Sequence, residues 1–338
     1  MSLSIAIAVF AGATLIIAIG GTRLARAGDQ LADLTGLGEA MVGALLLGIA
    51  TSLPGIITTV YAAYTNHPQL AISNGIGGIA AQTFFLAIAD IVYRRTNLEH
   101  AAASFANLMQ GVLLLGLLGI VLLGMAGPQV SLFHLHPFSL VMIAAYLAGS
   151  RLVSKASRDP MWSPEITQDT VEDQPDEEYL KQLSLPKVAT QFVLLAAVVA
   201  GAGYAVAEAG IAMADKSGLS EGLVGSLFTA VSSSLPELIV SIAAVRQGAL
   251  TLAVGNIIGG NTFDVLFVAL GDLAYLDGSI LHAISDEQLF TMALTITMTS
   301  VLLLGLLHRE KQGFGNIGWE SMGLMLLYLL GNVFVYLG

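Results

Sequence analysis

The sequence predicts an all-α integral membrane protein with ten transmembrane helices, arranged as two inverted five-helix repeats. Of its 338 residues, 55% are hydrophobic and 11% are charged, whereas soluble domains carry roughly 25% charged residues. The mean hydropathy is +0.79. Apolar runs of about 20 residues, the length that spans a bilayer, recur along the chain, and its two halves repeat one another.

Each apolar run predicts one span. The first run lacks a basic start and is followed by Arg23 and Arg26, which favours a retained helix over a cleaved signal peptide. In chain order the predicted spans are 3–22, 40–64, 70–92, 104–125, 131–151, 188–209, 222–245, 251–275, 288–307 and 317–337.

The basic residues predict the orientation. If the N-terminus is outside, twelve of the 13 lysines and arginines fall on the inner side and only Lys216 falls outside. Such a bias is typical of cytoplasmic loops, so both termini are predicted to lie outside. The short linker and the lack of targeting features favour a prokaryotic inner membrane.

A shift of 182 residues aligns the halves without a gap. "GLGEAMVGALLLGIATSLPG" (36–55) falls on "GLSEGLVGSLFTAVSSSLPE" (218–237), and "SNGIGGIAAQTFFLAIAD" (73–90) falls on "GNIIGGNTFDVLFVALGD" (255–272). Equivalent spans lie five apart, an odd number, so the halves cross the membrane in opposite directions. Inverted repeats are typical of secondary transporters whose substrate site lies near the midplane. We predict a first repeat over 1–152, an acidic cytoplasmic linker over 153–186 and a second repeat over 187–338.

The linker carries many acidic residues but lacks the spacing of a calcium-binding loop, so a solvated tether is favoured over a calcium sensor. The six histidines fall at span ends or in loops without zinc-site spacing, which predicts surface positions. The chain has no cysteine, which excludes disulfides and thiolate sites. It also shows no nucleophile–base pair, phosphate-binding loop or hydrolase motif, so we predict no enzyme.

Prolines and glycine pairs predict broken helices at membrane depth. Pro54 and Pro236 lie mid-span and leave the carbonyls of Ala50 and Ser232 without a helical partner. Glycine pairs in spans three and eight loosen those helices and let neighbours approach. These pairs are Gly77–Gly78 and Gly259–Gly260.

Two carboxylates lie in the same stretch. Glu237 and Asp264 fall inside apolar spans, where a charge costs several kcal/mol unless it is compensated. Ser233 shares a helix face with Glu237, and Gly260 shares one with Asp264, because each pair is four residues apart. Carboxylates, hydroxyls and carbonyls suit a hard cation such as Ca²⁺ or Na⁺. Glu237 and Asp264 are the predicted metal-binding residues.

The phrases "SSLPELIVS" and "GNIIGGNTFD", echoed by "TSLPGIITT" and "SNGIGGIAAQ", resemble the two alpha repeats of the calcium/cation antiporter superfamily, the sodium/calcium exchanger family. The resemblance covers essentially the whole chain. It implies ten spans and exchange of Ca²⁺ for Na⁺, H⁺ or K⁺ by alternating access. The ion-site positions it implies are Thr51, Ser52, Gly55, Gly78 and Gln82 in the first repeat, and Ser233, Ser234, Glu237, Gly260 and Asp264 in the second, with Asn261 as a further candidate ligand.

The chain departs from the family pattern in its first half. The family has glutamate after the proline in both repeats, but here Gly55 stands in the first. Gly78 and Gly260 stand where the family has serine, and Gln82 replaces an asparagine-type residue. The first half therefore supplies no acid to the site.

We predict a secondary-active antiporter that exchanges Ca²⁺ for Na⁺ or H⁺ by alternating access at a midplane carboxylate site. Its expected partners are the transported cations and the lipid bilayer, with no cofactor and no nucleic acid; the oligomeric state is undefined by the sequence. Two alternatives are a monovalent cation/proton antiporter on the same fold, which the missing acid favours, and a non-transporting membrane relative.

Overall fold

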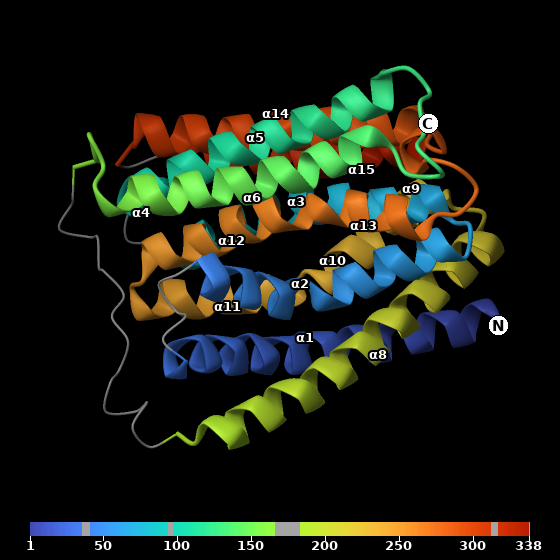
Figure 1. Ribbon diagram of the computed structural model, residues 1–338, viewed down its shortest axis with the longest axis horizontal. Coiled ribbons are helices and arrows are strands. Elements are labelled where there is room, and N and C mark those ends of the chain that lie inside the picture. Colours follow the sequence, from blue (N-terminus) through green and yellow to red (C-terminus); the bar gives the residue numbers. More distant parts are fainter. Residues whose placement is uncertain (36–40, 94–96, 166–182, 312–316, 338) are drawn as a thin grey trace.

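The protein forms a bundle of helices lying side by side (Figure 1). This computed structural model describes residues 1–35, 41–93, 97–165, 183–311 and 317–337. The first half contains α1 (Leu3–Leu34), α2 (Met41–Tyr64), α3 (Pro68–Tyr93), α4 (Leu98–Ala102), α5 (Phe105–Ala126) and α6 (Pro137–Arg158). The second half contains α8 (Leu185–Ser217), α9 (Glu221–Leu223), the π-helix η1 (Val224–Thr229), α10 (Ala230–Ser233), α11 (Leu235–Gln247), α12 (Leu250–Asp264), α13 (Leu266–Ala274), η2 (Ile280–His282), α14 (Asp286–His308) and α15 (Trp319–Leu337).

Each predicted span range contains a helix. Within the described residues, eight helices are long and apolar enough to cross a membrane, and the bent pair formed by 221–233 and 235–247 makes nine. Helix α2, with part of its side chains outside the description, occupies the second predicted range. The all-helical membrane class is confirmed, and the count of ten stays a prediction. Residues 166–182, half of the predicted acidic linker, lie outside the described residues.

The two halves run in opposite senses. Helices α1 and α8 are the first helix of each half, and they lie alongside one another in opposite directions (Figure 1). Both extend beyond the predicted ranges 3–22 and 188–209. In α1, Arg23 and Arg26 continue the helix rather than end it. Arginine is a good helix former, so the apolar run marks only the membrane-buried part.

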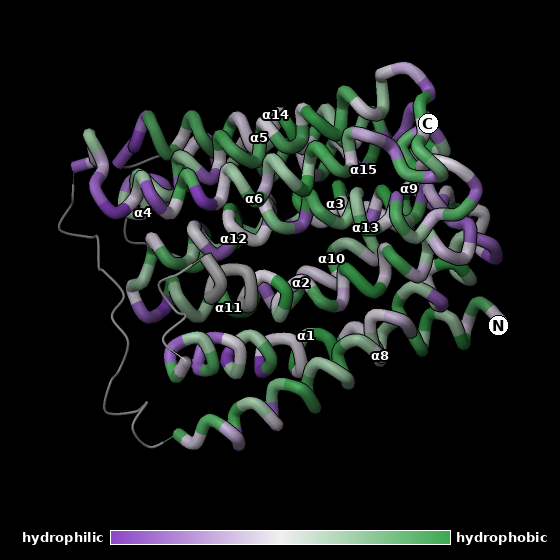
Figure 2. The backbone as a smooth tube through the Cα atoms, viewed as in Figure 1, coloured by the Kyte–Doolittle hydropathy of each residue, from purple (hydrophilic) through white to green (hydrophobic). Residues whose placement is uncertain are grey.

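The repeated phrases occupy the centre of the bundle. In their most apolar windows, 78% of α3 and 72% of the α12–α13 span are buried, compared with 22% of α1. Hydrophilic residues gather toward the ends of the helices (Figure 2). The central helices are therefore shielded from lipid by their neighbours, and polar side chains on them contact protein instead.

The helix breaks differ from those predicted. The second-half span bends by 47° between α10 and α11, at Ser234 beside Pro236. Helix α2 continues through Pro54, and α3 continues through Gly77–Gly78. Proline removes a single helical hydrogen bond, which surrounding helices tolerate. A Cβ at Gly77 would lie 2.5 Å from the Cα of Ser226, so this glycine serves close packing.

The break predicted at the glycine pair of span eight is absent. Helix α12 runs through Gly259–Gly260 to Asp264, and Val265 keeps helical dihedrals (φ −55°, ψ −30°), so Leu250–Ala274 forms one span. A Cβ at Gly259 would lie 3.4 Å from the Oε1 of Gln110 on α5. This glycine therefore serves a helix–helix contact and not a break in the helix.

A buried aspartate near the end of α13, Asp272, holds neighbouring elements together as an anchor. Asp272 accepts hydrogen bonds from the backbone N–H groups of His136 (2.7 Å) and Ile280 (2.9 Å). It also accepts them from the hydroxyls of Ser139 (2.6 Å) and Ser279 (2.9 Å). His136 is buried by this contact, so the predicted surface position is wrong for that histidine. One carboxylate thus joins α13, η2 and the start of α6.

The first half has the same anchor at the other end of the bundle. Asp90, fully buried on α3, accepts hydrogen bonds from the N–H groups of Leu98 (2.8 Å) and Gly318 (3.1 Å). Residues 182 positions apart are called repeat equivalents below. Leu98 and Gly318 are the repeat equivalents of Ile280 and His136. Matching contacts at opposite ends support the inverted repeat.

Candidate functional site

The Asp264 carboxyl is held by side chains of the first half. It is 2% exposed at the C-terminal end of α12. Its Oδ1 accepts a hydrogen bond from the hydroxyl of Ser52 on α2 at 2.5 Å, and its Oδ2 accepts one from the amide of Gln82 on α3 at 2.6 Å. Gln82 is the repeat equivalent of Asp264. The contact therefore joins equivalent positions across the pseudo-symmetry axis.

The Glu237 carboxyl lies beside Asp264. Glu237 is 1% exposed, in the first turn of α11 directly after the helix break. It interacts with the charge of Asp264 and with the side chain of Thr51 on α2. Its Oε2 is buried and has no hydrogen-bond partner. No lysine or arginine of the described residues forms an ion pair with either carboxyl. The two carboxyls thus lie at the centre of the bundle without a basic partner in the described part of the chain.

The other candidate ligands lie at different distances from this pair. Ser234 joins the group, because its hydroxyl accepts a bond from Gln82 at 3.2 Å. Ser233 instead donates to the Ala230 carbonyl on its own helix at 3.2 Å. Asn261 donates to the hydroxyl of Thr83 at 3.0 Å. Thr51, Ser52 and Gln82 therefore contact the carboxyl pair directly, and Ser234 is linked to it through Gln82.

The glycines of the site lie against these ligands. A Cβ at Gly78 would lie 3.6 Å from the Ser234 hydroxyl, and one at Gly260 would lie 3.2 Å from the Gln82 carbonyl oxygen. These positions let the equivalent helices α3 and α12 bring their polar side chains together. The backbone candidates Ala50 and Ser232 are both buried; each precedes its proline by four residues, so its carbonyl lacks the usual helical donor.

Two residues of this region were not identified from the sequence. Thr14 on α1 shares a 2.5 Å hydrogen bond with the hydroxyl of Ser232, which brings the first helix to the helix break. Phe267 lies against Gly55, where an added Cβ would be 2.5 Å from the ring. A signal existed for Phe267, because its repeat equivalent is also a phenylalanine, Phe85. Nothing in the apolar run around Thr14 marked it.

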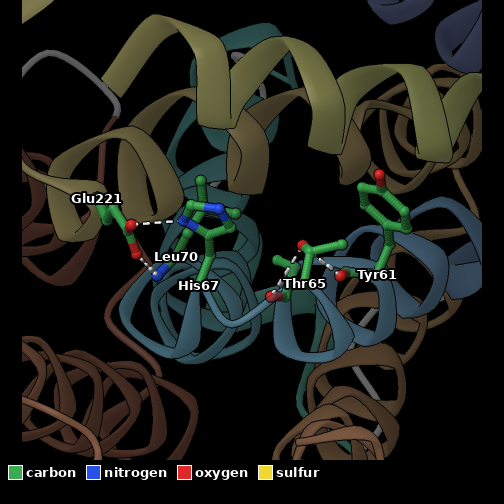
Figure 3. Close-up of polar contacts among 6 residues, drawn as sticks. Tyr61, Thr65, His67, Leu70 and Glu221 are labelled. Carbon is green, nitrogen blue, oxygen red and sulfur yellow. Dashed lines mark hydrogen bonds and ion pairs between the residues drawn. The ribbon is translucent and has the colours of Figure 1, made fainter. Parts of the chain in front are cut away.

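A separate ion pair joins the halves at the end of the bundle that carries the termini. The Nδ1 of His67, between α2 and α3, lies 2.6 Å from the Oε1 of Glu221 at the start of α9 (Figure 3). The second oxygen of Glu221 accepts a bond from the N–H of Leu70 at 3.4 Å. Hydrogen bonding to Glu221 raises the pKa of His67 above its usual value. This pair lies apart from the central carboxyls.

Comparison with known proteins shows which family the sequence resembles. A family model described as "Sodium/calcium exchanger protein" matches residues 5–150 and 187–337. The sodium/calcium exchanger MaX1 of Methanosarcina acetivorans is 34% identical over 135 residues, which are 40% of this chain and 36% of that protein. The inner membrane protein YrbG of Escherichia coli is 25% identical over 328 residues, covering 95% of this chain and 96% of that protein.

Solved structures share the fold. An H⁺/Ca²⁺ exchanger, CAX, aligns with a TM-score of 0.73 and 16% identity, over 98% of this chain and 85% of its own. The sodium–calcium exchanger NCX_Mj aligns with a TM-score of 0.62 and 19% identity, over 97% and 98% of the two chains. The family consists of membrane transporters and not of enzymes. Because the family match spans both repeats, this chain belongs to the sodium/calcium exchanger protein family.

Proposed function

We propose that this protein is a secondary-active cation antiporter, which exchanges Ca²⁺ for Na⁺ or H⁺ at the Glu237–Asp264 pair. The observation that carries the proposal is the burial of two adjacent carboxyls, 1% and 2% exposed, with one oxygen lacking any partner. Buried carboxyls without a counter-charge are costly. A protein that retains such a pair between two inverted halves gains from a cation that binds there.

The ligands define the charge that the site takes. Two ionised carboxylates carry a charge of −2, which one Ca²⁺ or two monovalent ions neutralise. Ser52 and Gln82 donate to Asp264 in the structure, but each also has an oxygen that can turn toward a cation. Ca²⁺ takes six to eight oxygen ligands. Thr51, Ser52, Gln82, Ser233, Ser234 and Asn261, with the carbonyls of Ala50 and Ser232, are the proposed source of the neutral ones.

Exchange follows from the cost of the empty site. A pair of uncompensated charges reorients through the membrane only at high cost, whereas a site neutralised by cations or protons reorients more easily. Cations and protons compete for the same oxygens. Alternating access then couples entry of one cation to exit of another. The bend at Ser234 beside Glu237 is the proposed point at which the second half changes its facing.

We propose that the protein lies in a prokaryotic inner membrane with both termini outside. The proposed domains are a first repeat over 1–152, a linker over 153–186 and a second repeat over 187–338. The relatives support the membrane setting, since the Escherichia coli relative is named an inner membrane protein. In the predicted topology, twelve of the 13 basic residues fall on the same side as the linker, which supports a cytoplasmic linker and termini outside.

Transport in proteoliposomes tests the function. We expect uptake of radiolabelled Ca²⁺ under an outward Na⁺ or H⁺ gradient, and its loss in Glu237→Gln. A parallel assay with labelled Na⁺ and an imposed pH gradient addresses the second candidate, monovalent cation/proton exchange. That candidate is favoured by Gly55, because the first half then supplies no carboxylate to the site. Absence of both activities in folded, reconstituted protein would overturn the antiporter proposal and favour a non-transporting membrane relative.

A further inference from the structure

The two carboxyls of the site both come from the second half, and the equivalent positions in the first half are not empty. Gly55 is the repeat equivalent of Glu237, and Gln82 is that of Asp264. The structure shows what occupies the space beside Gly55. A Cβ built on Gly55 would lie 2.5 Å from Cε2 and 3.1 Å from Cζ of Phe267. The ring of Phe267 therefore fills the volume where a side chain at this position would begin.

Phe267 is held in that place from several directions. It is 3% exposed, on α13. A Cβ on Gly75 would lie 3.2 Å from the Cβ of Phe267, so α3 approaches the base of the side chain. The ring centroid of Phe263 lies 6.5 Å away, edge to face. Phe263 in turn packs against Gly48, where a Cβ would lie 3.3 Å from its ring. Close packing of this kind leaves the ring little room to withdraw.

The glycines that accept these rings belong to the first half alone. The repeat equivalents of Gly48, Gly55 and Gly75 are Ala230, Glu237 and Ile257, which all carry side chains. The second half thus places a carboxyl where the first half admits an aromatic ring from its partner. The two halves therefore fill equivalent volumes differently. Beside Gly55 the edge of an apolar ring occupies the space that a third carboxylate would take.

We propose that Phe267 is a specificity-determining residue of the cation site. Its ring closes the side of the site next to Gly55, excludes water and ligand oxygens there, and limits the site to the charge of Glu237 and Asp264. This inference rests on the proposed function, because it concerns the cation that the carboxyl pair binds. It predicts that a carboxylate at position 55 is compatible with the fold only when the ring is removed.

The experiment uses purified full-length protein in detergent and measures the melting temperature with and without Ca²⁺ or Na⁺, since a ligand stabilises the folded state that binds it. The variants are G55A, G55E, F267A, G55A/F267A and G55E/F267A. We expect G55A and G55E to melt lower than the unsubstituted protein. Removing the ring should relieve the clash, so G55A/F267A should lose less stability than the sum of its single variants.

The ion measurement separates specificity from packing. In G55E/F267A the site gains a carboxylate, and we expect the Ca²⁺ concentration of half-maximal stabilisation to fall at least about tenfold relative to F267A, because ligand charge tunes Ca²⁺ affinity. The Na⁺ midpoint should change less. The matched control is G55E/F85A, which removes the repeat-equivalent ring and should not rescue G55E.

Each outcome has a definite reading. Additive losses in G55A and F267A, or rescue of G55E by F85A as well as by F267A, would overturn the role of Phe267. An unchanged ratio of Ca²⁺ to Na⁺ midpoints in a folded G55E/F267A would also overturn it. Failure of the proposed function looks different, since the unsubstituted protein would then show no cation-dependent stabilisation, while the non-additivity of G55A and F267A would persist.

Discussion

Asp90 and Asp272 are repeat equivalents, and each accepts hydrogen bonds from equivalent backbone N–H groups at opposite ends of the bundle. Gly55 and Glu237 are repeat equivalents too, yet one lies against an aromatic ring and the other carries a buried carboxyl. The two anchors therefore agree in both halves, whereas Gly55 and Glu237 differ at the centre. The kept anchor positions serve the fold, and the divergent central position is a candidate for specificity.

The largest expected effect is at the centre. Glu237→Gln and Asp264→Asn each remove one of the two carboxylates proposed to bind the cation. We expect cation-driven uptake in proteoliposomes to fall by about 100-fold or more, because breaking a buried charged contact costs about 3–5 kcal/mol. Asp277→Asn, which neutralises an exposed carboxyl, is the matched control and should transport normally. Full activity in both site variants would show that the divergent centre is not the transport site.

The anchors should affect stability in both halves. Asp272→Ala leaves four hydrogen-bond donors of the fold without their acceptor, at a cost of about 1–3 kcal/mol for each buried donor left unsatisfied. Asp90→Ala removes the acceptor of two backbone N–H groups. We expect both variants to melt at lower temperature in detergent, with the larger shift for Asp272→Ala. A normal melting temperature in either would break the equivalence of the two anchors.

The anchor of the first half has an added carboxyl nearby that the other anchor lacks. Glu99, fully buried on α4, is the repeat equivalent of Leu281. Burial, with further contributions from Asp90 and Glu320, raises the pKa of Glu99 well above its usual value. A raised carboxyl pKa means that the folded state binds the proton more tightly than the unfolded state. The stability that protonation provides is complete below the unfolded pKa of about 4.3 and is lost as the pH rises through the folded pKa.

Thermal melts across pH test this difference between the anchors. We expect the protein to melt at higher temperature near pH 5 than near pH 8, and Glu99→Gln to reduce that dependence because its side chain cannot ionise. Glu99→Leu, which installs the residue of the second half, should reduce it as well. If both variants keep the pH dependence of the unsubstituted protein, the titrating group lies elsewhere.

The smallest expected effect concerns the His67–Glu221 pair. The repeat equivalent of His67 is Ala249. An alanine cannot form an ion pair, so the opposite end of the bundle lacks an equivalent of this link. The pKa of His67 is raised, so the contribution of the pair is full below the ordinary histidine pKa of about 6.5 and disappears as the pH rises through the folded value. The side chains are 24% and 27% exposed, which limits the effect to about 1 kcal/mol or less.

The variant His67→Ala addresses this link. Its melting temperature should fall slightly at pH 6 and match that of the unsubstituted protein at pH 9. His134→Ala provides a control, since the Nε2 of His134 bonds to the Leu273 carbonyl at 3.3 Å and forms no ion pair within the described part of the chain. A loss that persists undiminished at pH 9 would assign His67 a packing role instead of an electrostatic one.

Much of the architecture was predictable because it depends on local sequence. A run of about 20 apolar residues is long enough to span a bilayer whatever its neighbours are, and a gap-free repeat across an odd number of spans requires inversion. The carboxyls Glu237 and Asp264 were predictable for the same reason, since a charged residue inside an apolar run stands out in the sequence alone. The family match confirmed the class that these signals indicated.

The position of the helix breaks depended on packing and was predicted less well. Pro236 coincides with a bend, whereas Pro54 lies inside a continuous helix. Both prolines lose the same backbone hydrogen bond. Around Pro54, its carbonyl accepts a bond from Thr58 at 2.8 Å and contacts Gly203 of α8, so neighbouring groups support the helix there. Thr58 is local, whereas the contact with Gly203 comes from a helix distant in the sequence.

By itself the sequence determined the membrane class, the two inverted halves and the two carboxyls, because each is written in a short window or in a comparison of two windows. Only the tertiary structure decided what replaces the third carboxyl. Gly55 and Phe267 are separated by more than half the chain, and either residue alone reads as ordinary helix packing. Only their contact shows that the Phe267 ring excludes a side chain at position 55, since two groups cannot occupy one volume.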